Sequence, residues 1–289
     1  MTSQRSVLVT GASTGIGAAC VSRLDQLGYR VFAGVRKPED GDRLRSAGSD
    51  RIVPIRLDVT RSDEIAAAAR TLDEAVGPAG LGGLVNNAGI AIGGPIEYLG
   101  VEAVRLQFEV NVFGLLAVTQ ALLPAIRRAR GRIINIGSIA GRSVSPFVVP
   151  YCMSKYAVEA LTDGLRLELA GTRIEVAVVE PGAVKTPIWD KGLDSLGDAT
   201  RTLPPIAHER YGAKLKFFGK LLRYNDERGV PPEQVVDAVL HALEADRPRT
   251  RYLVGRDARI RAFLGRILPD RAGDALLLSV LARLERRLA

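Results

Sequence analysis

The chain has 289 residues, 47% of them hydrophobic and 25% charged, which is enough to bury a large core and excludes a wholly disordered protein. Cys20 and Cys152 are the only cysteines, so a disulfide scaffold is excluded and a reducing compartment is indicated. His208 and His241 are the only histidines, too few beside two cysteines for a zinc site, and we expect no metal.

The charge of the chain is concentrated at one end. The net charge is +8, and residues 247–289 hold eleven arginines and no lysine against four acidic residues, a net +7. The nearly neutral remainder does not favour nucleic-acid binding, so we expect no nucleic-acid partner. A basic tail that touches phosphates or anionic lipid is the alternative.

The N-terminal residues do not have the pattern of a targeting segment. Met1 to Arg5 lead straight into an apolar run, which is not the pattern of a signal peptide, and no stretch reaches about 18 uninterrupted apolar residues. We therefore expect a cytoplasmic protein without a spanning helix, with membrane association as the alternative.

Short runs rich in valine and isoleucine alternate with helical patterns along the chain. Each run is typical of a buried parallel strand, and the alternation predicts one doubly wound α/β domain over residues 1–289, with about seven parallel strands and helices on both faces. The expected strands are 6–10, 30–34, 52–55, 84–87, 132–136, 174–179 and 251–254. The clearest expected helices are 62–76, 101–128 and 232–244.

Two segments depart from this rhythm. Residues 187–228 contain five of the fifteen aromatic residues, which indicates either a helical excursion with its own small core or a lid over an apolar substrate pocket. Residues 256–289 repeat apolar side chains at helical spacing and predict a C-terminal extension of amphipathic helices. Such helices pack on their own domain or at a subunit interface, and peripheral membrane contact is the alternative.

A glycine-rich loop follows the first expected strand, reading Thr10-Gly11-Ala12-Ser13-Thr14-Gly15-Ile16-Gly17. Glycines let the backbone approach a pyrophosphate, and the following helix start offers unpaired N–H groups. The loop lacks the Gly-Lys-Ser/Thr of nucleotide-hydrolysing proteins, so it favours dinucleotide binding over hydrolysis. A turn without a ligand is the alternative.

The end of the second expected strand indicates which dinucleotide is preferred. It reads Gly34-Val35-Arg36-Lys37, with no acidic residue before Glu39. An acid there would bind the ribose hydroxyls of NAD, whereas arginine accommodates the 2'-phosphate of NADP. The sequence therefore favours NADP(H), with NAD(H) as the alternative.

Tyr151 and Lys155 are spaced to lie on one face of a helix, and Ser138 follows the fifth expected strand. A tyrosine that removes a proton from an alcohol must ionise more easily than its usual pKa near ~10 allows, and an adjacent ammonium favours the phenolate. We therefore predict that Lys155 lowers the pKa of Tyr151. A serine hydrolase is excluded because G-x-S-x-G is absent.

Taken together, these motifs resemble the short-chain dehydrogenase/reductase family over residues 6–187. The matching patterns are T-G-x-x-x-G-I-G at Thr10–Gly17, N-N-A-G at Asn86–Gly89, Ser138, Y-x-x-x-K at Tyr151–Lys155, and P-G followed by Thr at Pro181, Gly182 and Thr186. The resemblance implies a Rossmann domain and an oxidoreductase.

The resemblance also implies individual roles. Tyr151 would be the acid/base, Lys155 would bind the nicotinamide ribose, Ser138 would hold the substrate oxygen, and Asn111 would help to hold a water linked to Lys155. Asp58 would bind the adenine amino group. Read without the family, Asn111 is a polar residue that bends a helix and Asp58 forms a turn. The full set of expected cofactor residues is Gly11, Ser13, Thr14, Gly15, Ile16, Gly17, Arg36, Asp58, Val59, Asn87, Ala88, Gly89, Tyr151, Lys155, Pro181, Gly182, Val184 and Thr186.

Residues 150–160 and 179–182 are similar to the retinol and 17-beta-hydroxysteroid dehydrogenases, which implies an apolar alcohol, ketone or aldehyde as substrate. We expect an NADP(H)-dependent oxidoreductase for a steroid-like, retinoid-like or other lipid-like molecule. The alternatives are a catalytically silent NADP(H) sensor and a membrane-surface protein acting through its basic end. The family implies a homodimer or homotetramer through helices 101–128 and 151–170.

Overall fold

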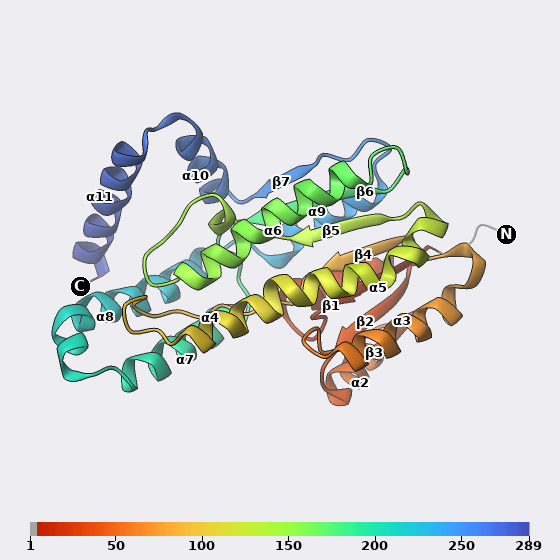
Figure 1. Ribbon diagram of the computed structural model, residues 1–289, viewed down its shortest axis with the longest axis horizontal. Coiled ribbons are helices and arrows are strands. Elements are labelled where there is room, and N and C mark those ends of the chain that lie inside the picture. The colour runs from red at the N-terminus through yellow and green to blue at the C-terminus, as the bar shows by residue number, and fades with distance from the viewer. Residues whose placement is uncertain (1–4, 289) are drawn as a thin grey trace.

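The computed structural model describes residues 5–288, which form one seven-stranded parallel sheet with helices on both faces (Figure 1). The strand order is β3-β2-β1-β4-β5-β6-β7. The strands are β1 (Ser6–Thr10), β2 (Arg30–Val35), β3 (Ile52–Arg56), β4 (Gly83–Asn86), β5 (Arg132–Ile136), β6 (Glu175–Pro181) and β7 (Arg251–Val254).

The predicted doubly wound fold and its seven strands are confirmed, with small shifts at strand ends. β6 extends two residues beyond the expected Val179 because its last four residues pair with β7. β4 ends at Asn86 because the amide of Asn87 donates to the Thr10 hydroxyl, at 2.9 Å, and leaves the sheet.

Helices cover the two faces of the sheet with different partners. One face packs against α1 (Gly15–Gln26), α2 (Pro38–Ser46) and α9 (Pro232–Glu244). The other packs against α3 (Ser62–Val76), α5 (Gly114–Ala129) and α6 (Val149–Glu168), which lie in front in Figure 1. Because both faces are covered, the strands are buried on both sides and read as continuous apolar runs.

The chain returns across the sheet after β3, so the strand order reverses between β1 and β4. In open parallel sheets, ligands bind outside the carboxyl ends of the strands at such a reversal. The loops after β1, β4, β5 and β6 therefore meet at the edge where a site is expected.

The expected helix 101–128 is divided. α4 (Val101–Phe108) and α5 are joined by a π-helical turn, η2 (Glu109–Phe113), which contains Asn111. By length and composition the stretch Val101–Ala129 would also qualify as a membrane span, with a mean hydropathy of 1.5. In this fold its apolar side packs on the sheet through buried residues of α5, namely Val118, Leu122, Ala125 and Ile126.

The two irregular segments form a third core beside the sheet. Residues 187–228 fold into α7 (Ile188–Arg201) and α8 (Pro205–Arg228), and the C-terminal extension into α10 (Arg256–Ile267) and α11 (Asp270–Leu288), which lies beside α8 (Figure 1). Buried leucines of α7 and α8 pack with Phe218, Trp189, Leu281 and Leu284. The aromatic residues therefore do pack with one another, and the same helices form the wall of a cavity described below.

Candidate active site

The glycine loop between β1 and α1 is shaped by backbone contacts that exclude side chains. Gly11 has φ +61°, and a Cβ there would lie 2.8 Å from the Cα of Ala88. A Cβ on Gly17 would lie 2.3 Å from the carbonyl oxygen of Gly11. These positions require glycine, and the loop leaves its backbone open to a ligand at the start of α1.

The segment after β4 supports this loop. The amides of Asn87 and Ala88 donate to the Thr10 hydroxyl at 2.9 and 3.0 Å. The side-chain nitrogen of Asn87 donates to the carbonyls of Thr10 and Gly11, each at 3.0 Å. The Asn-Asn-Ala-Gly motif thus fixes the geometry of the glycine loop through these hydrogen bonds.

A cavity of about 770 Å³ extends from this loop along the carboxyl ends of β2 and β3. Most expected cofactor residues of the first half of the chain line it, and Gly17 does not, because it is packed inside the loop. The residues on this wall are Gly11, Ser13, Thr14, Gly15, Ile16, Arg36, Asp58, Val59, Asn87, Ala88, Gly89 and Thr186.

Arg36 is exposed at the end of β2 and faces Asp58, which follows β3. Burial raises the pKa of Asp58, but hydrogen bonds from Thr60 and the charges of Arg36 and Arg61 outweigh it and hold the pKa below its usual value. Asp58 is therefore ionised, and it accepts from the Thr60 amide at 3.0 Å. This wall thus combines an exposed guanidinium with a fixed carboxylate.

Tyr151 and Lys155 lie on α6 and Ser138 follows β5, as expected. The ammonium of Lys155 lies 5.7 Å from the centre of the Tyr151 ring and donates to the carbonyl of Ile136 at 2.7 Å. Ser138 is buried, and its hydroxyl accepts from the Ala140 amide at 3.1 Å. The three side chains line one cavity of about 370 Å³ with Pro181, Gly182 and Val184.

The predicted effect of Lys155 on Tyr151 is not seen in this state. Burial raises the pKa of Tyr151 to about 12, while a hydrogen bond with Ser138 acts in the opposite direction. Burial also lowers the pKa of Lys155 to about 8, and the negative charge of Glu159 opposes this. Because burial raises its pKa, Tyr151 is held in its protonated form, and a cation bound in the cavity would lower that pKa.

Asn111 is buried but does not line either cavity. Its side chain accepts from the Ile90 amide at 2.9 Å and donates to the Ile90 carbonyl at 3.1 Å and to Ser154 at 3.1 Å. Ser154 in turn donates to the carbonyl of Tyr151 at 2.7 Å. Asn111 therefore joins η2, the loop after β4 and the start of α6 through long-range contacts, rather than through a local bond that bends its helix.

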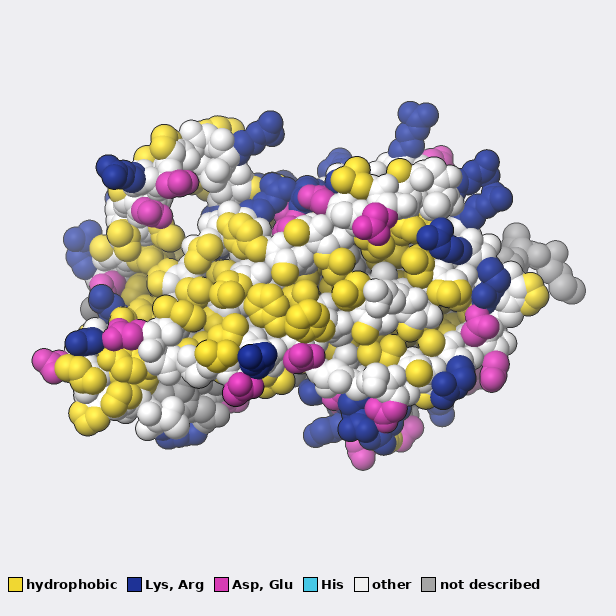
Figure 2. Space-filling model, viewed as in Figure 1, with side chains coloured by type: hydrophobic (Ala, Val, Ile, Leu, Met, Phe, Trp, Pro, Cys, Tyr) yellow, Lys and Arg dark blue, Asp and Glu magenta, His cyan; other side chains and the backbone are white. Residues whose placement is uncertain are grey.

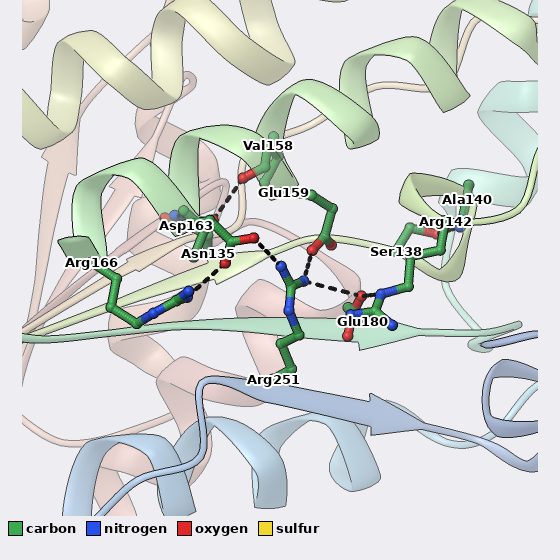
Figure 3. Close-up of polar contacts among 11 residues, drawn as sticks. Asn135, Ser138, Ala140, Arg142, Val158, Glu159, Asp163, Arg166, Glu180 and Arg251 are labelled. Atoms are coloured by element: carbon green, nitrogen blue, oxygen red, sulfur yellow. Dashed lines mark hydrogen bonds and ion pairs between the residues drawn. The ribbon is translucent and has the colours of Figure 1, made fainter. Parts of the chain in front are cut away.

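A charged cluster joins α6 to β6 and β7, one helical turn along α6 from Lys155, and Figure 3 shows its members. Arg251 of β7 contacts Glu159 and Asp163 of α6 and lies 3.6 Å from Glu180 of β6, while Arg142 contacts Glu180 at 2.5 Å. Burial, together with the charge of Glu180, raises the pKa of Glu159 to about 7. The cluster thus ties together the four elements that carry or adjoin the reacting groups.

The two cavities share part of their lining, including Ile16, Asn87, Gly89 and Thr186. The glycine loop and the Ser138–Tyr151 pair therefore face one continuous space. The structure brings together all of the expected site residues on the cavity walls except Gly17 and Asn111, which support the walls from behind.

Several contributors were not predicted from the sequence, among them Arg43, Asn225 and Arg261. Arg43 of α2 donates to the carbonyl of Ser13 in the glycine loop at 2.9 Å, and an arginine one helix turn into α2 is the available signal. Asn225 of α8 and Arg261 of α10 line the smaller cavity. Arg261 carried no signal, because it is one of many C-terminal arginines.

The short chain dehydrogenase family model matches residues 5–195. Retinol dehydrogenase 16 of Homo sapiens is 38% identical over 276 residues, covering 94% of this chain and 87% of the relative. The 17-beta-hydroxysteroid dehydrogenase type 6 of Homo sapiens is 38% identical over 280 residues, with the same coverage.

Solved structures of short-chain dehydrogenases superpose on this chain. A short-chain dehydrogenase from Streptomyces avermitilis superposes with a TM-score of 0.76 at 28% identity, covering 99% of this chain and 96% of the other. A short chain dehydrogenase from Burkholderia cenocepacia J2315 in complex with NADP gives 0.70 at 31% identity, covering 98% and 99%. The chain therefore belongs to the short-chain dehydrogenase family, is similar to its retinol and hydroxysteroid dehydrogenases, and is an oxidoreductase.

Proposed function

We propose that this protein uses NADP(H) to interconvert an apolar alcohol and its ketone or aldehyde, with Tyr151 exchanging the proton of the substrate oxygen. The observation that carries the proposal is the continuous space shared by the glycine loop and the Ser138–Tyr151 pair. The names of the relatives, a retinol and a 17-beta-hydroxysteroid dehydrogenase, support an apolar substrate.

The residues present fit the cofactor. The glycine loop offers an open backbone beside the start of α1, as a pyrophosphate requires, and Arg36 offers a guanidinium where a 2'-phosphate would lie. The complex of the Burkholderia cenocepacia relative with NADP supports the same choice. When bound, NADPH supplies the hydride.

The protein's own groups handle the proton. Ser138 and Tyr151 both line the cavity and share a side-chain hydrogen bond, so their hydroxyl groups can together hold the substrate oxygen. Tyr151 is protonated at neutral pH, which suits donation to a carbonyl oxygen during reduction. Lys155 adds positive charge beside the phenol as the proton leaves.

The test is a titration with NADPH and NADH, followed by a panel of apolar ketones and aldehydes with nicotinamide absorbance as the readout. We expect tighter binding of NADPH and its consumption only when a ketone or aldehyde is added. Failure to bind either nucleotide would contradict the proposal. Nucleotide binding without turnover across the panel would favour the sensor alternative.

We propose membrane-surface contact as a second property of the C-terminal helices. α10 and α11 expose large apolar side chains among the C-terminal arginines, namely Ile260, Phe263, Ile267, Leu276, Leu278 and Val280. Such surfaces bind anionic lipid interfaces. We expect the protein to co-sediment with anionic but not with neutral vesicles. Added salt should weaken this binding, and Phe263→Glu should abolish it. Failure of the protein to sediment with anionic vesicles would contradict the proposal.

We also propose a homodimer through α4, α5 and α6. Figure 2 shows hydrophobic side chains gathered over the face that these helices form, and the exposed ones include Leu106, Phe113, Met153, Tyr156 and Leu167. Exposed apolar patches of this kind mark protein interfaces. Light scattering should give a dimer mass that Phe113→Asp reduces to the monomer, and a monomeric natural protein would contradict the proposal.

A further inference from the structure

The cavity that holds Ser138 and Tyr151 is mostly apolar. Its wall is formed by side chains of α7, α8 and α11, namely Trp189, Phe218, Leu221, Leu222 and Leu281. Away from the glycine loop and the reacting groups, the polar residues of this lining within residues 5–288 are Ser145, Thr186, Asn225, Asp257 and Arg261. Burying a cationic group in such a wall costs free energy unless the group is paired with an anion.

Arg261 has only neutral partners in the protein. Its Nε donates to the Ser143 hydroxyl at 3.2 Å, and Nη2 donates to the Ser143 carbonyl at 2.8 Å and to the Ser145 hydroxyl at 3.2 Å. Across residues 5–288, no carboxylate forms an ion pair with its guanidinium and no hydrogen bond from Nη1 is found. Donor capacity is therefore free at the cavity wall.

Asp257, one turn earlier on α10, does not neutralise Arg261. Asp257 is exposed to solvent, which screens its charge, and its Oδ2 accepts from the Ala183 amide at 2.9 Å. Arg251 provides the contrast, because its guanidinium contacts the carboxylates of Glu159 and Asp163. Burial lowers the pKa of Arg261, and the charges of Cys152, Asp257 and Tyr156 oppose this only in part.

We propose that Arg261 binds a carboxylate on the substrate, so that the natural substrate class is an apolar hydroxy acid or oxo acid. The inference rests on the proposed function, because the carboxylate belongs to the same molecule whose alcohol or carbonyl group lies at Tyr151. A guanidinium binds a carboxylate through two parallel hydrogen bonds, and these are strong where water is partly excluded. The apolar side chains that line the same cavity would hold the hydrocarbon body of the substrate.

A different role for Arg261 makes a different prediction. Its bonds to Ser143 and Ser145 tie α10 to the loop between Ser138 and Tyr151. If that were its only role, loss of Arg261 would weaken the binding of acidic and neutral substrates equally. A substrate and its methyl ester share one hydrocarbon body and differ in charge, so the pair separates the two roles.

Binding is measured first, because it does not require turnover. Trp189 is the only tryptophan and lines the cavity, so its fluorescence reports on ligands there. We expect decanoate to bind at least about tenfold more tightly than methyl decanoate, as for a charge-assisted hydrogen bond. Arg261→Gln should remove this preference and Arg261→Lys should keep part of it. Arg259→Gln, an exposed arginine of the same helix, should leave it unchanged.

Turnover is measured next, with ω-hydroxydecanoate, its methyl ester and NADP+. We expect Arg261→Gln to raise KM for the acid about tenfold or more with little change in kcat, and to leave the ester within about twofold. Equal binding of decanoate and its ester, or an equal loss for both substrates in Arg261→Gln, would overturn the inference. If neither substrate reacts, the panel of ketones and aldehydes still tests the proposed function, and the fluorescence comparison alone decides whether Arg261 binds a carboxylate.

Discussion

In the region of the glycine loop, β2 and β3, which we call the loop side, the site is built mainly from backbone. Glycine positions in the loop and hydrogen bonds from the segment after β4 fix its shape, as at Gly17 and Asn87. In the region of α7, α8, α10 and α11, the lid side, the site is built from side chains of distant segments, such as Trp189, Arg261 and Leu281. A backbone site tolerates few substitutions, whereas a side-chain site changes specificity one residue at a time.

The difference predicts that the two sides fail separately. A substitution on the loop side should alter nucleotide binding and leave substrate binding on the lid side unchanged. A substitution on the lid side should alter substrate binding and leave nucleotide binding unchanged. A variant that affected both equally would break the comparison.

Among the variants that compare the two sides, Gly17→Ala should have the largest effect on nucleotide binding. Its Cβ would lie 2.3 Å from the Gly11 carbonyl and 2.6 Å from the Asn87 side chain, so the loop must move. We expect NADPH affinity to fall by about a hundredfold, equivalent to ~2.7 kcal/mol, in a fluorescence titration. Gly164→Ala, where a Cβ meets nothing within 4 Å, is the control and should bind normally. Unchanged NADPH binding in Gly17→Ala would contradict the backbone account.

Arg36→Ala should sharpen the comparison by changing the cofactor preference alone. Loss of a charge-assisted bond to the 2'-phosphate should weaken NADPH binding by about tenfold to a hundredfold and leave NADH unchanged. Calorimetric titration with both nucleotides measures this. Arg45→Ala, an exposed arginine of α2, is the matched control. An equal loss of affinity for NADPH and NADH would show that Arg36 does not bind the 2'-phosphate.

Glu159→Gln tests the charged cluster that joins α6 to β6 and β7. The pKa of Glu159 is about 7 in the folded protein, above its usual value, so folding favours the protonated form. The raised pKa of Glu159 contributes to the free energy of unfolding below about pH 4.5, and this contribution is lost as the pH rises through about 7.

Between about pH 5 and pH 8 the natural protein should therefore lose about 1–2 kcal/mol of unfolding free energy relative to Glu159→Gln. Urea unfolding at the two pH values measures the difference. Glu168→Gln, at an exposed position on the same helix, should follow the natural protein. A parallel pH dependence in all three proteins would remove Glu159 as the cause.

Leu281→Ala should have the smallest effect. Leu281 is half-buried and lines the lid side of the cavity, so its truncation removes one apolar contact with the substrate. We expect KM for an apolar ketone to rise about threefold while NADPH affinity is unchanged. Leu278→Ala, at an exposed position of α11, should change neither value. Altered NADPH binding in Leu281→Ala would contradict the separation of the two sides.

The loop side could be predicted from the sequence because short motifs encode it. Alternating apolar runs predicted the sheet, and the spacing of Gly11, Gly15 and Gly17 predicted the loop. Helical spacing placed Tyr151 and Lys155 on one helix, but the direction of the Lys155 ammonium toward Ile136 depends on how α6 packs on β5. Its effect on the pKa of Tyr151 was therefore not predictable from spacing.

The lid side could not be predicted in the same way. The amphipathic pattern of residues 256–289 predicted helices, but Arg261 has the same sequence signal as its exposed neighbours Arg259 and Arg266. Only tertiary packing places Arg261 at the cavity and leaves the others in solvent. Asn111 is similar, because its partners Ile90 and Ser154 lie far from it in the chain.

The most direct test of the central claim is a single-turnover reaction with one equivalent of NADPH and an excess of an apolar ketone, compared between the natural protein and Tyr151→Phe. We expect both proteins to bind NADPH with equal affinity. The natural protein should consume it, while the variant consumes it about a thousandfold or more slowly, because the proton donor is lost. Consumption of NADPH by Tyr151→Phe at the natural rate would contradict the account.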